Sequence, residues 1–151
     1  HMQYSGVDFT YRDQESGESF IPNVIEISIG INRTMYALLD NSYWEDGDRV
    51  VLKLHKNIAP YNVAVFPLVK NKPEIVNKAK EVFAQLVEQG FRVAWDDRGN
   101  VGKRYYSQDE IGTPKGITID YKTLEDNTVT IRDRDTMEQI RVDISELKDN
   151  I

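Results

Sequence analysis

The stretch APYNVAVFPLV, which runs from Ala59 to Val69, decides the fold class. Its apolar centre, Val63–Phe66, is typical of a strand that is buried on both faces. The residues that follow predict a helix, because Pro73 can begin one, apolar side chains then recur at helical spacing, and Gly90 can end it. A buried strand followed by an amphipathic helix indicates an α/β domain.

Downstream of this helix, similar patterns continue to the end of the chain. We expect a strand at Phe91–Trp95, a loop over residues 96–100 and a helix at Val101–Ile111 that ends at Gly112. Further strands are expected near Ile117–Ile119, Tyr121–Lys122, Val129–Ile131 and Ile140–Ile144, with a turn at Asp126-Asn127 and a last short helix capped by Ser145. Residues 60–151 are therefore predicted to fold alone as an α/β domain with a mixed sheet.

Upstream of Ala59 the pattern is weaker. Alternation around Phe9 predicts a half-buried strand, and Val24–Ile29 forms a second apolar run. We also expect a helix capped by Asn32 with Met35, Tyr36, Leu38 and Leu39 on one face, a polar connection at Asn41–Asp48 and a strand at Arg49–Leu54. The residues before this last strand supply too few apolar positions to close a core, so they are interpreted as the end of a larger domain.

The composition excludes several classes of function. The chain has 151 residues, of which 40% are hydrophobic, and no apolar run approaches the roughly 20 residues that span a membrane. It has no cysteine, which excludes disulfides and thiolate metal sites. A net charge of −6 argues against unspecific binding to phosphates. We interpret His1-Met2 as a cloning scar and see no signal peptide.

The residues offer little for catalysis. His55 is the only native histidine, so we expect neither a metal site nor a serine triad. The adjacent carboxylates Asp96 and Asp97 are typical of a loop. The sequence from Gly99 to Arg104 is not a P-loop, but it contains a G-x-x-G near a predicted helix N-terminus, where Lys103 and free N–H groups favour an anion.

The charges Arg132-Asp133-Arg134-Asp135 alternate in sign, and two interpretations stay open. A solvated edge strand carries such charges to prevent strand pairing. A surface that reads unpaired bases also needs donors and acceptors together, because base edges present both.

The chain also resembles a known family. The stretches APYNVAVFPLV (Ala59 to Val69) and GKRYYSQDEIGTPKGITIDYKTLEDNTVTIRDRDTMEQIRV (Gly102 to Val142), with the IAP that starts at Ile58, closely resemble the anticodon-binding domain of glycyl-tRNA synthetases of the archaeal and eukaryotic dimeric type. The resemblance implies a mixed, roughly five-stranded sheet flanked by helices, and a cytoplasmic protein that binds tRNA-Gly. It places this domain at residues 59–151, after a catalytic-domain remnant at residues 3–58 and the scar at residues 1–2.

The upstream stretch FIPNVIEIS, from Phe20 to Ser28, resembles the same family, and Gly30-Ile31-Asn32-Arg33 resembles class II motif 3. The resemblance implies that Arg33 lies against ATP, which the whole enzyme uses with Mg²⁺, and that Glu26 and Ser28 hold glycine. It also implies a remnant of the antiparallel class II catalytic domain. Motifs 1 and 2 are absent, so we expect the fragment to be inactive alone and to hold no cofactor.

The family resemblance also suggests which residues contact the anticodon. These are Lys103, Arg104, Gln108 and Asp109 on the second helix and Arg132, Arg134, Asp135 and Gln139 on the later strands. The implied partners are tRNA-Gly, with glycine and ATP for the full enzyme, no membrane, and a second subunit in a homodimer. Two alternatives remain: a non-catalytic tRNA-binding or accessory module, and one half of a naturally split synthetase.

Overall fold

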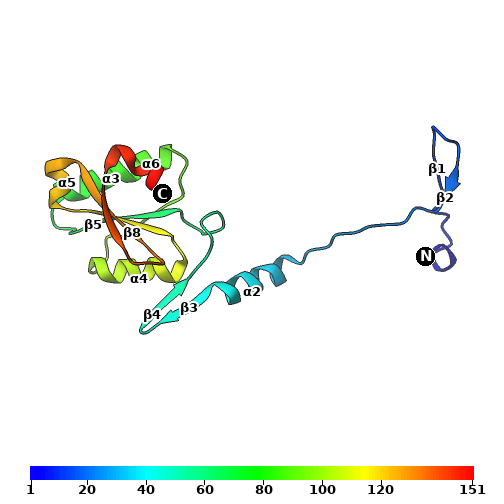
Figure 1. Ribbon diagram of the computed structural model, residues 1–151, viewed down its shortest axis with the longest axis horizontal. Coiled ribbons are helices and arrows are strands. Elements are labelled where there is room, and N and C mark those ends of the chain that lie inside the picture. The colour runs from blue at the N-terminus through cyan, green and yellow to red at the C-terminus, as the bar shows by residue number, and fades with distance from the viewer. The chain divides into compact units, whose positions relative to one another are not determined.

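A computed structural model describes residues 1–151, which divide into the units His1–Ile31 and Asn32–Ile151. The first unit holds a short helix, α1 (Met2–Ser5), and two antiparallel strands, β1 (Tyr11–Arg12) and β2 (Ser19–Phe20), which Figure 1 shows. The rings of Tyr11 and Phe20 pack edge to face at 5.7 Å between centroids. Residues 21–30 have no regular structure, so the expected strand at Val24–Ile29 is wrong. An apolar run becomes a strand only where a neighbour pairs with its backbone.

The second unit begins at Asn32, within α2 (Ile31–Ser42), and continues with a hairpin of β3 (Tyr43–Asp46) and β4 (Arg49–Leu52). Because α2 begins at Ile31, Asn32 lies inside the helix and is not its N-cap. The polar connection expected at Asn41–Asp48 is also wrong, since residues 43–46 pair with β4. The ammonium of Lys53 lies 4.0 Å from the centroid of the Trp44 ring on β3, a cation–π contact.

The rest of the unit is built on a mixed sheet in the order β6-β5-β7-β8-β9. The strands are β5 (Val63–Pro67), β6 (Val93–Trp95), β7 (Lys115–Ile119), β8 (Thr128–Asp133) and β9 (Gln139–Asp143). The first three run parallel, and β8 and β9 are antiparallel to their neighbours. The predicted α/β class and five-stranded mixed sheet are confirmed.

Two helices cover opposite faces of the sheet, α3 (Pro73–Glu88) and α4 (Val101–Ile111) (Figure 1). The alternation within β5 explains why this strand is apolar throughout. Val63 and Val65 join the core under α3, whereas Ala64 and Phe66 pack against Tyr105 of α4. Each helix therefore has its own buried cluster.

A short helix, α5 (Tyr121–Asp126), stands where the sequence predicted a strand at Tyr121–Lys122. A capping box fixes it, because Asp120 accepts from the backbone of Thr123 while the Thr123 hydroxyl accepts from the backbone of Asp120. The chain ends with a 3₁₀ turn (Ile144–Glu146), capped by Asp143 and not by Ser145, and with α6 (Leu147–Asn150). None of the helices has the length and apolar character to cross a membrane.

Candidate nucleic-acid interface

Of the alternating charges at the end of β8, the two arginines lie inside the fold, whereas Asp133 is half-buried and Asp135 is exposed. β8 has neighbours on both sides, β7 and β9, so the solvated edge strand is wrong. The exposed fraction of Arg132 is 6% and that of Arg134 is 5%. Buried arginines need partners, and the structure supplies them from distant parts of the chain.

Arg132 is held by Asp109 of α4. Its two terminal nitrogens donate to the two carboxylate oxygens at 3.0 and 3.1 Å, the bidentate pairing that a guanidinium favours. The guanidinium also lies 4.9 Å from the centroid of Tyr105. Asp109 accepts a third bond, at 2.8 Å, from Nε of Arg49 on β4. One carboxylate therefore connects the sheet, helix α4 and the hairpin.

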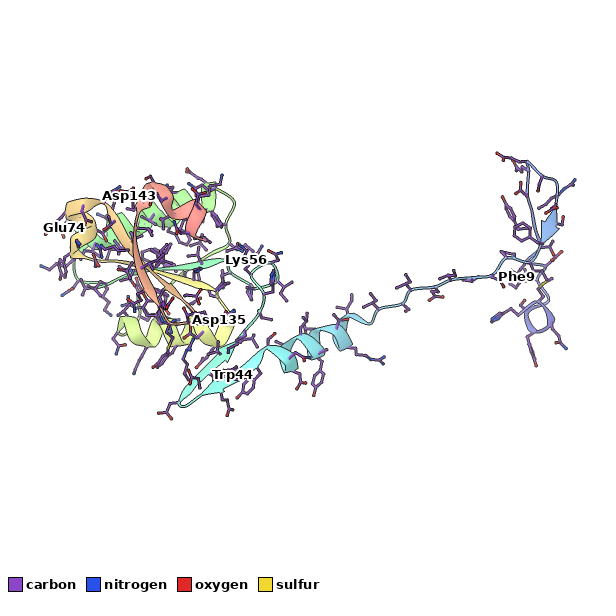
Figure 2. The ribbon with its side chains drawn as sticks, in the orientation of Figure 1. Phe9, Trp44, Lys56, Glu74, Asp135 and Asp143 are labelled. Carbon is purple, nitrogen blue, oxygen red and sulfur yellow. The ribbon has the colours of Figure 1, made fainter.

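Arg134 joins the same hairpin to the end of α4. Its Nη1 donates to the carbonyls of Leu52, Leu54 and Gly112 at 3.1, 2.9 and 2.8 Å. Its other two nitrogens donate to the carboxylate of Asp135, each at 2.9 Å. Figure 2 shows Asp135 beside the hairpin that carries Trp44. Every nitrogen of Arg134 thus has a partner within the chain.

Two further predicted anticodon residues are equally enclosed. Arg104, with an exposed fraction of 2%, donates to four carbonyls, those of Pro67, Asp97, Arg98 and Gly99, at 2.5 to 3.2 Å. Gln108 accepts a hydrogen bond of 2.7 Å from the Thr113 hydroxyl. These side chains hold the loop before α4 and the turn after it. Contact with RNA stays a prediction for them.

The first turn of α4 carries Lys103, a predicted anticodon residue whose side chain is exposed. Asn100 is the N-cap, and its side chain accepts from the backbone N–H of Lys103 at 2.9 Å. Gly99 has a φ of +60°, which glycine adopts freely as the chain turns into the helix. Gly102 lies inside the helix. The Lys103 side chain is exposed, so it can approach an anion.

Beside this turn lies a hollow of about 420 Å³ between α4 and the strands β8 and β9. It is lined by Asn100, Gly102, Lys103, Tyr105, Tyr106, Arg132, Met137 and Gln139. A second hollow, of about 220 Å³, is lined by Leu68, Val101, Tyr105, Thr118, Asp120, Thr130 and Gln139. The two share Tyr105 and Gln139, and we call them together the α4–β9 groove. It brings together three of the eight predicted anticodon residues: Lys103, Arg132 and Gln139.

Two side chains give the groove surfaces on which a base can stack. Tyr106 is 51% exposed and Met137 is 47% exposed, and both line the larger hollow. Met137 has a φ of +61°, in the left-handed region that side-chain-bearing residues seldom adopt. Met137 adopts it where the chain turns from β8 to β9, and its backbone N–H donates to the carbonyl of Asp133 at 3.0 Å. An aromatic ring, a thioether, an amide and a cation together suit an unpaired nucleotide.

Asp120 and Tyr105 line the groove and have shifted pKa values, as does Asp133, which follows Arg132 in the chain but lies outside the lining. Hydrogen bonds from Arg141, at 2.8 and 2.9 Å, are the main cause that lowers the pKa of Asp120 to about 2. For Asp133, burial raises the pKa, but hydrogen bonds from the backbone of Thr136 and from Lys115 outweigh it and bring the pKa to about 2. Burial raises the pKa of the Tyr105 hydroxyl, which hydrogen-bonds Thr118 at 2.6 Å. These groups keep one charge state near neutral pH.

The residues implied for glycine and ATP are not brought together within one unit. Glu26 and Ser28 belong to the unit His1–Ile31, and Arg33 lies in the first turn of α2 in the other unit. All three side chains are exposed. Their roles therefore stay proposals.

Sequence reasoning missed Arg49, Tyr106 and Met137 as parts of the site. A signal for Arg49 was present, because in the predicted strand it shares the buried face with Val51. An arginine at a buried strand position indicates a partner carboxylate elsewhere. Met137 follows a turn and has no comparable sequence signal.

The comparisons with known proteins agree with this architecture. The anticodon binding domain model matches residues 62–151, and the chain belongs to this family. It is homologous to the C-terminal region of glycine–tRNA ligases, as the resemblance predicted. The glycine–tRNA ligase of Clostridium tetani is 50% identical over 152 residues, which cover 97% of this chain and 32% of that protein. That of Aeropyrum pernix is 47% identical over 139 residues, covering 92% and 24%.

The chain thus spans about a quarter to a third of the length of the curated relatives it matches. Among solved structures, the crystal structure of prolyl-tRNA synthetase from Cryptosporidium parvum, complexed with L-proline and AMP, is similar with a TM-score of 0.59 and 27% identity. The match covers 67% of this chain and 21% of that one. The fold is therefore shared with part of a synthetase for another amino acid.

Proposed function

We propose that this chain recognises the anticodon loop of tRNA-Gly through the α4–β9 groove. One observation supports this most directly: in a chain of the anticodon-binding family, Lys103, Arg132 and Gln139 line one hollow together with the exposed ring of Tyr106. A hollow of about 420 Å³ has the size of a small-molecule site and is large enough for a base.

The eight predicted residues would divide into two kinds of role. Lys103 would contact phosphate and Gln139 would pair with a base edge, because both side chains are exposed. Arg132 would offer a base the N–H donors that Asp109 does not use, from the floor of the groove. The other five residues would shape the groove, because each makes hydrogen bonds within the chain. They are Arg104, Gln108, Asp109, Arg134 and Asp135.

The net charge of −6 fits this mode of binding better than it fits wrapping of duplex phosphates. Few phosphate contacts give weak affinity, and selectivity then comes from bases in the groove. We therefore expect modest, salt-sensitive affinity of the isolated chain for tRNA.

For the whole protein we propose ATP-dependent glycylation of tRNA-Gly in the cytoplasm, by a homodimer. Arg33 would then counter the charge of ATP, which acts with Mg²⁺ and supplies the activating phosphates when bound. Glu26 would hold the ammonium of glycine and Ser28 would assist it. The chain alone is proposed to be inactive, since class II motifs 1 and 2 lie outside it.

The experiment measures affinity of this chain for tRNA-Gly transcripts with the native anticodon and with each anticodon base substituted. We expect the native transcript to bind about 5- to 150-fold more tightly, since one lost base contact costs about 1–3 kcal/mol. Equal affinity for all transcripts would overturn base recognition. In parallel, glycine-dependent pyrophosphate exchange should give no signal, and a clear signal would overturn the proposed inactivity.

A further inference from the structure

The buried carboxylate of Asp109 is shared by two arginines from distant parts of the chain. Its exposed fraction is 1%, and it accepts from Arg132 twice and from Arg49 once. Arg49 is also enclosed, at 7% exposed, and donates to the backbone carbonyl of Arg134. Charges removed from water in this way are stable only with all partners present. The three side chains therefore form one unit, which we call the Arg49–Asp109–Arg132 triad.

The triad faces the groove on one side only. Arg132 lines the larger hollow, whereas neither Arg49 nor Asp109 does. A guanidinium carries five N–H donors, and Asp109 takes two of them from Arg132. Two parallel bonds also fix the plane of the guanidinium. The direction of the remaining donors therefore depends on where the Asp109 carboxylate is held.

Arg49 fixes that carboxylate. Its Nε donates to Oδ2, the same oxygen that accepts from Nη2 of Arg132. Residue 49 lies before residues 62–151, so it is outside the part that matches the family model. Close packing of the hairpin against α4 permits the contact: Gly112 has a φ of +89°, and a side chain there would come within 2.8 Å of the Leu52 carbonyl.

We infer that Arg49 and Asp109 are positioning residues for anticodon recognition, and that the β3–β4 hairpin completes the floor of the groove through them. This inference rests on the proposed function. Arg49 acts through Arg132: without Arg49 the carboxylate can turn, and the guanidinium of Arg132 loses its fixed plane. The consequence is a loss of discrimination between anticodons, whereas contacts made by Lys103 with phosphate persist.

The test measures discrimination, the ratio of dissociation constants for a base-substituted and the native tRNA-Gly anticodon stem-loop, with this 151-residue chain. We expect Arg132→Met to lower discrimination about tenfold and Arg49→Met about fivefold. The double variant should equal Arg132→Met alone, because Arg49 has nothing left to position. A purely structural role of Arg49 would instead make the two losses multiply.

Arg92→Met is the control for removal of an arginine outside the groove, although Arg92 is exposed and Arg49 is buried. Arg92 also ties backbone carbonyls, those of Ala59 and Pro60 at 3.0 and 3.1 Å, but it does not line the groove. It should leave discrimination unchanged. Arg49→Lys keeps a cation near Asp109 and should restore part of the discrimination, which keeps the test valid should Arg49→Met unfold.

The outcomes separate the two claims. If the unsubstituted chain binds both stem-loops equally, the proposed function fails and the positioning roles fail with it. If the chain discriminates and Arg132→Met lowers discrimination, but Arg49→Met behaves as the unsubstituted chain or adds its own factor in the double variant, only the positioning inference is overturned.

Discussion

Helices α3 and α4 pack on opposite faces of one sheet, yet they bury opposite kinds of side chain. The buried residues of α3 are all apolar: Ile75, Ala79, Val82 and Leu86. Those of α4 are mostly polar or charged: Arg104, Tyr105, Gln108 and Asp109. Apolar burial stabilises a fold but sets no particular orientation of the side chains, because it is non-directional. Buried polar groups are costly unless every partner is in place, so they fix geometry.

This contrast explains why the groove lies on the α4 side. Gly116 of β7 lets the Tyr105 ring approach the sheet, since a Cβ there would come within 2.7 Å of that ring. The guanidinium of Arg132 in turn lies over this ring. Under α3 no such opening is needed, and residues of β5, β7 and β8 close a continuous core. One face therefore holds the domain together, and the other shapes a binding surface.

The largest effect is expected from Asp109→Leu, which leaves Arg49 and Arg132 buried without their shared carboxylate. Removing one partner from a buried ionic group costs about 3–5 kcal/mol of unfolding free energy. Urea unfolding measures it, with Glu110→Gln as the control, because Glu110 is the exposed neighbour on the same helix. A loss below about 1 kcal/mol would show that the α4 face tolerates unpaired charge and would remove the contrast.

On the α3 face, Leu86→Ala removes a side chain that is completely buried in the apolar core. We expect a loss of about 3 kcal/mol of unfolding free energy, from lost burial and the cavity left behind. Discrimination between anticodons should not change, because Leu86 contacts neither hollow of the groove. Urea unfolding and stem-loop binding of the same sample check both statements. A variant that folds but loses discrimination would mean that the two faces are coupled.

Tyr106→Ala tests the groove without touching the core. Stacking of a base on an aromatic ring is worth about 1–3 kcal/mol, so stem-loop affinity should fall by that amount. Unfolding free energy should stay within about 0.5 kcal/mol, as for other exposed positions. Tyr121→Ala is the control, because Tyr121 is also 51% exposed but lies on α5. Equal affinities of the two variants would place the bound RNA elsewhere.

The contrast between the faces also sets how much could be predicted from sequence. The strand Val63–Pro67 and the helices α3 and α4 were predictable, because apolar spacing and glycine or proline at the ends define them locally. Helix α5 was not, since its six residues depend on the capping box of Asp120 and Thr123 and not on apolar periodicity. Strand β3 was missed because its residues are all exposed and polar neighbours surround Trp44.

For the site, residue types were more predictable than their roles. Lys103, Arg132 and Gln139 do share one hollow. Burial of Asp109 was not predictable, because its partners Arg132 and Arg49 are 23 and 60 residues away in the sequence. A charged residue in a sequence window is equally compatible with solvent and with a buried pair. Only tertiary packing separates the two.

The smallest expected effect is the pH dependence of stability, which should arise from carboxylates outside the apolar core under α3. The pKa values of Asp120 and Asp133 are lowered from 3.8 to about 2. A lowered folded-state pKa means that the stabilisation is complete above about pH 4 and is lost as pH falls through about pH 2. Both carboxylates are partly exposed, so solvent screening leaves about 1 kcal/mol for each.

Urea unfolding of the chain between about pH 2 and about pH 6 measures this loss, with Asp120→Asn as the comparison. The variant should start less stable near pH 6 and lose about 1 kcal/mol less on acidification, because Arg141 has already lost its charged partner. Identical pH profiles for the chain and the variant would show that the Asp120–Arg141 pair adds nothing to stability. The groove would then be ordered by the buried triad and not by the charges along its rim.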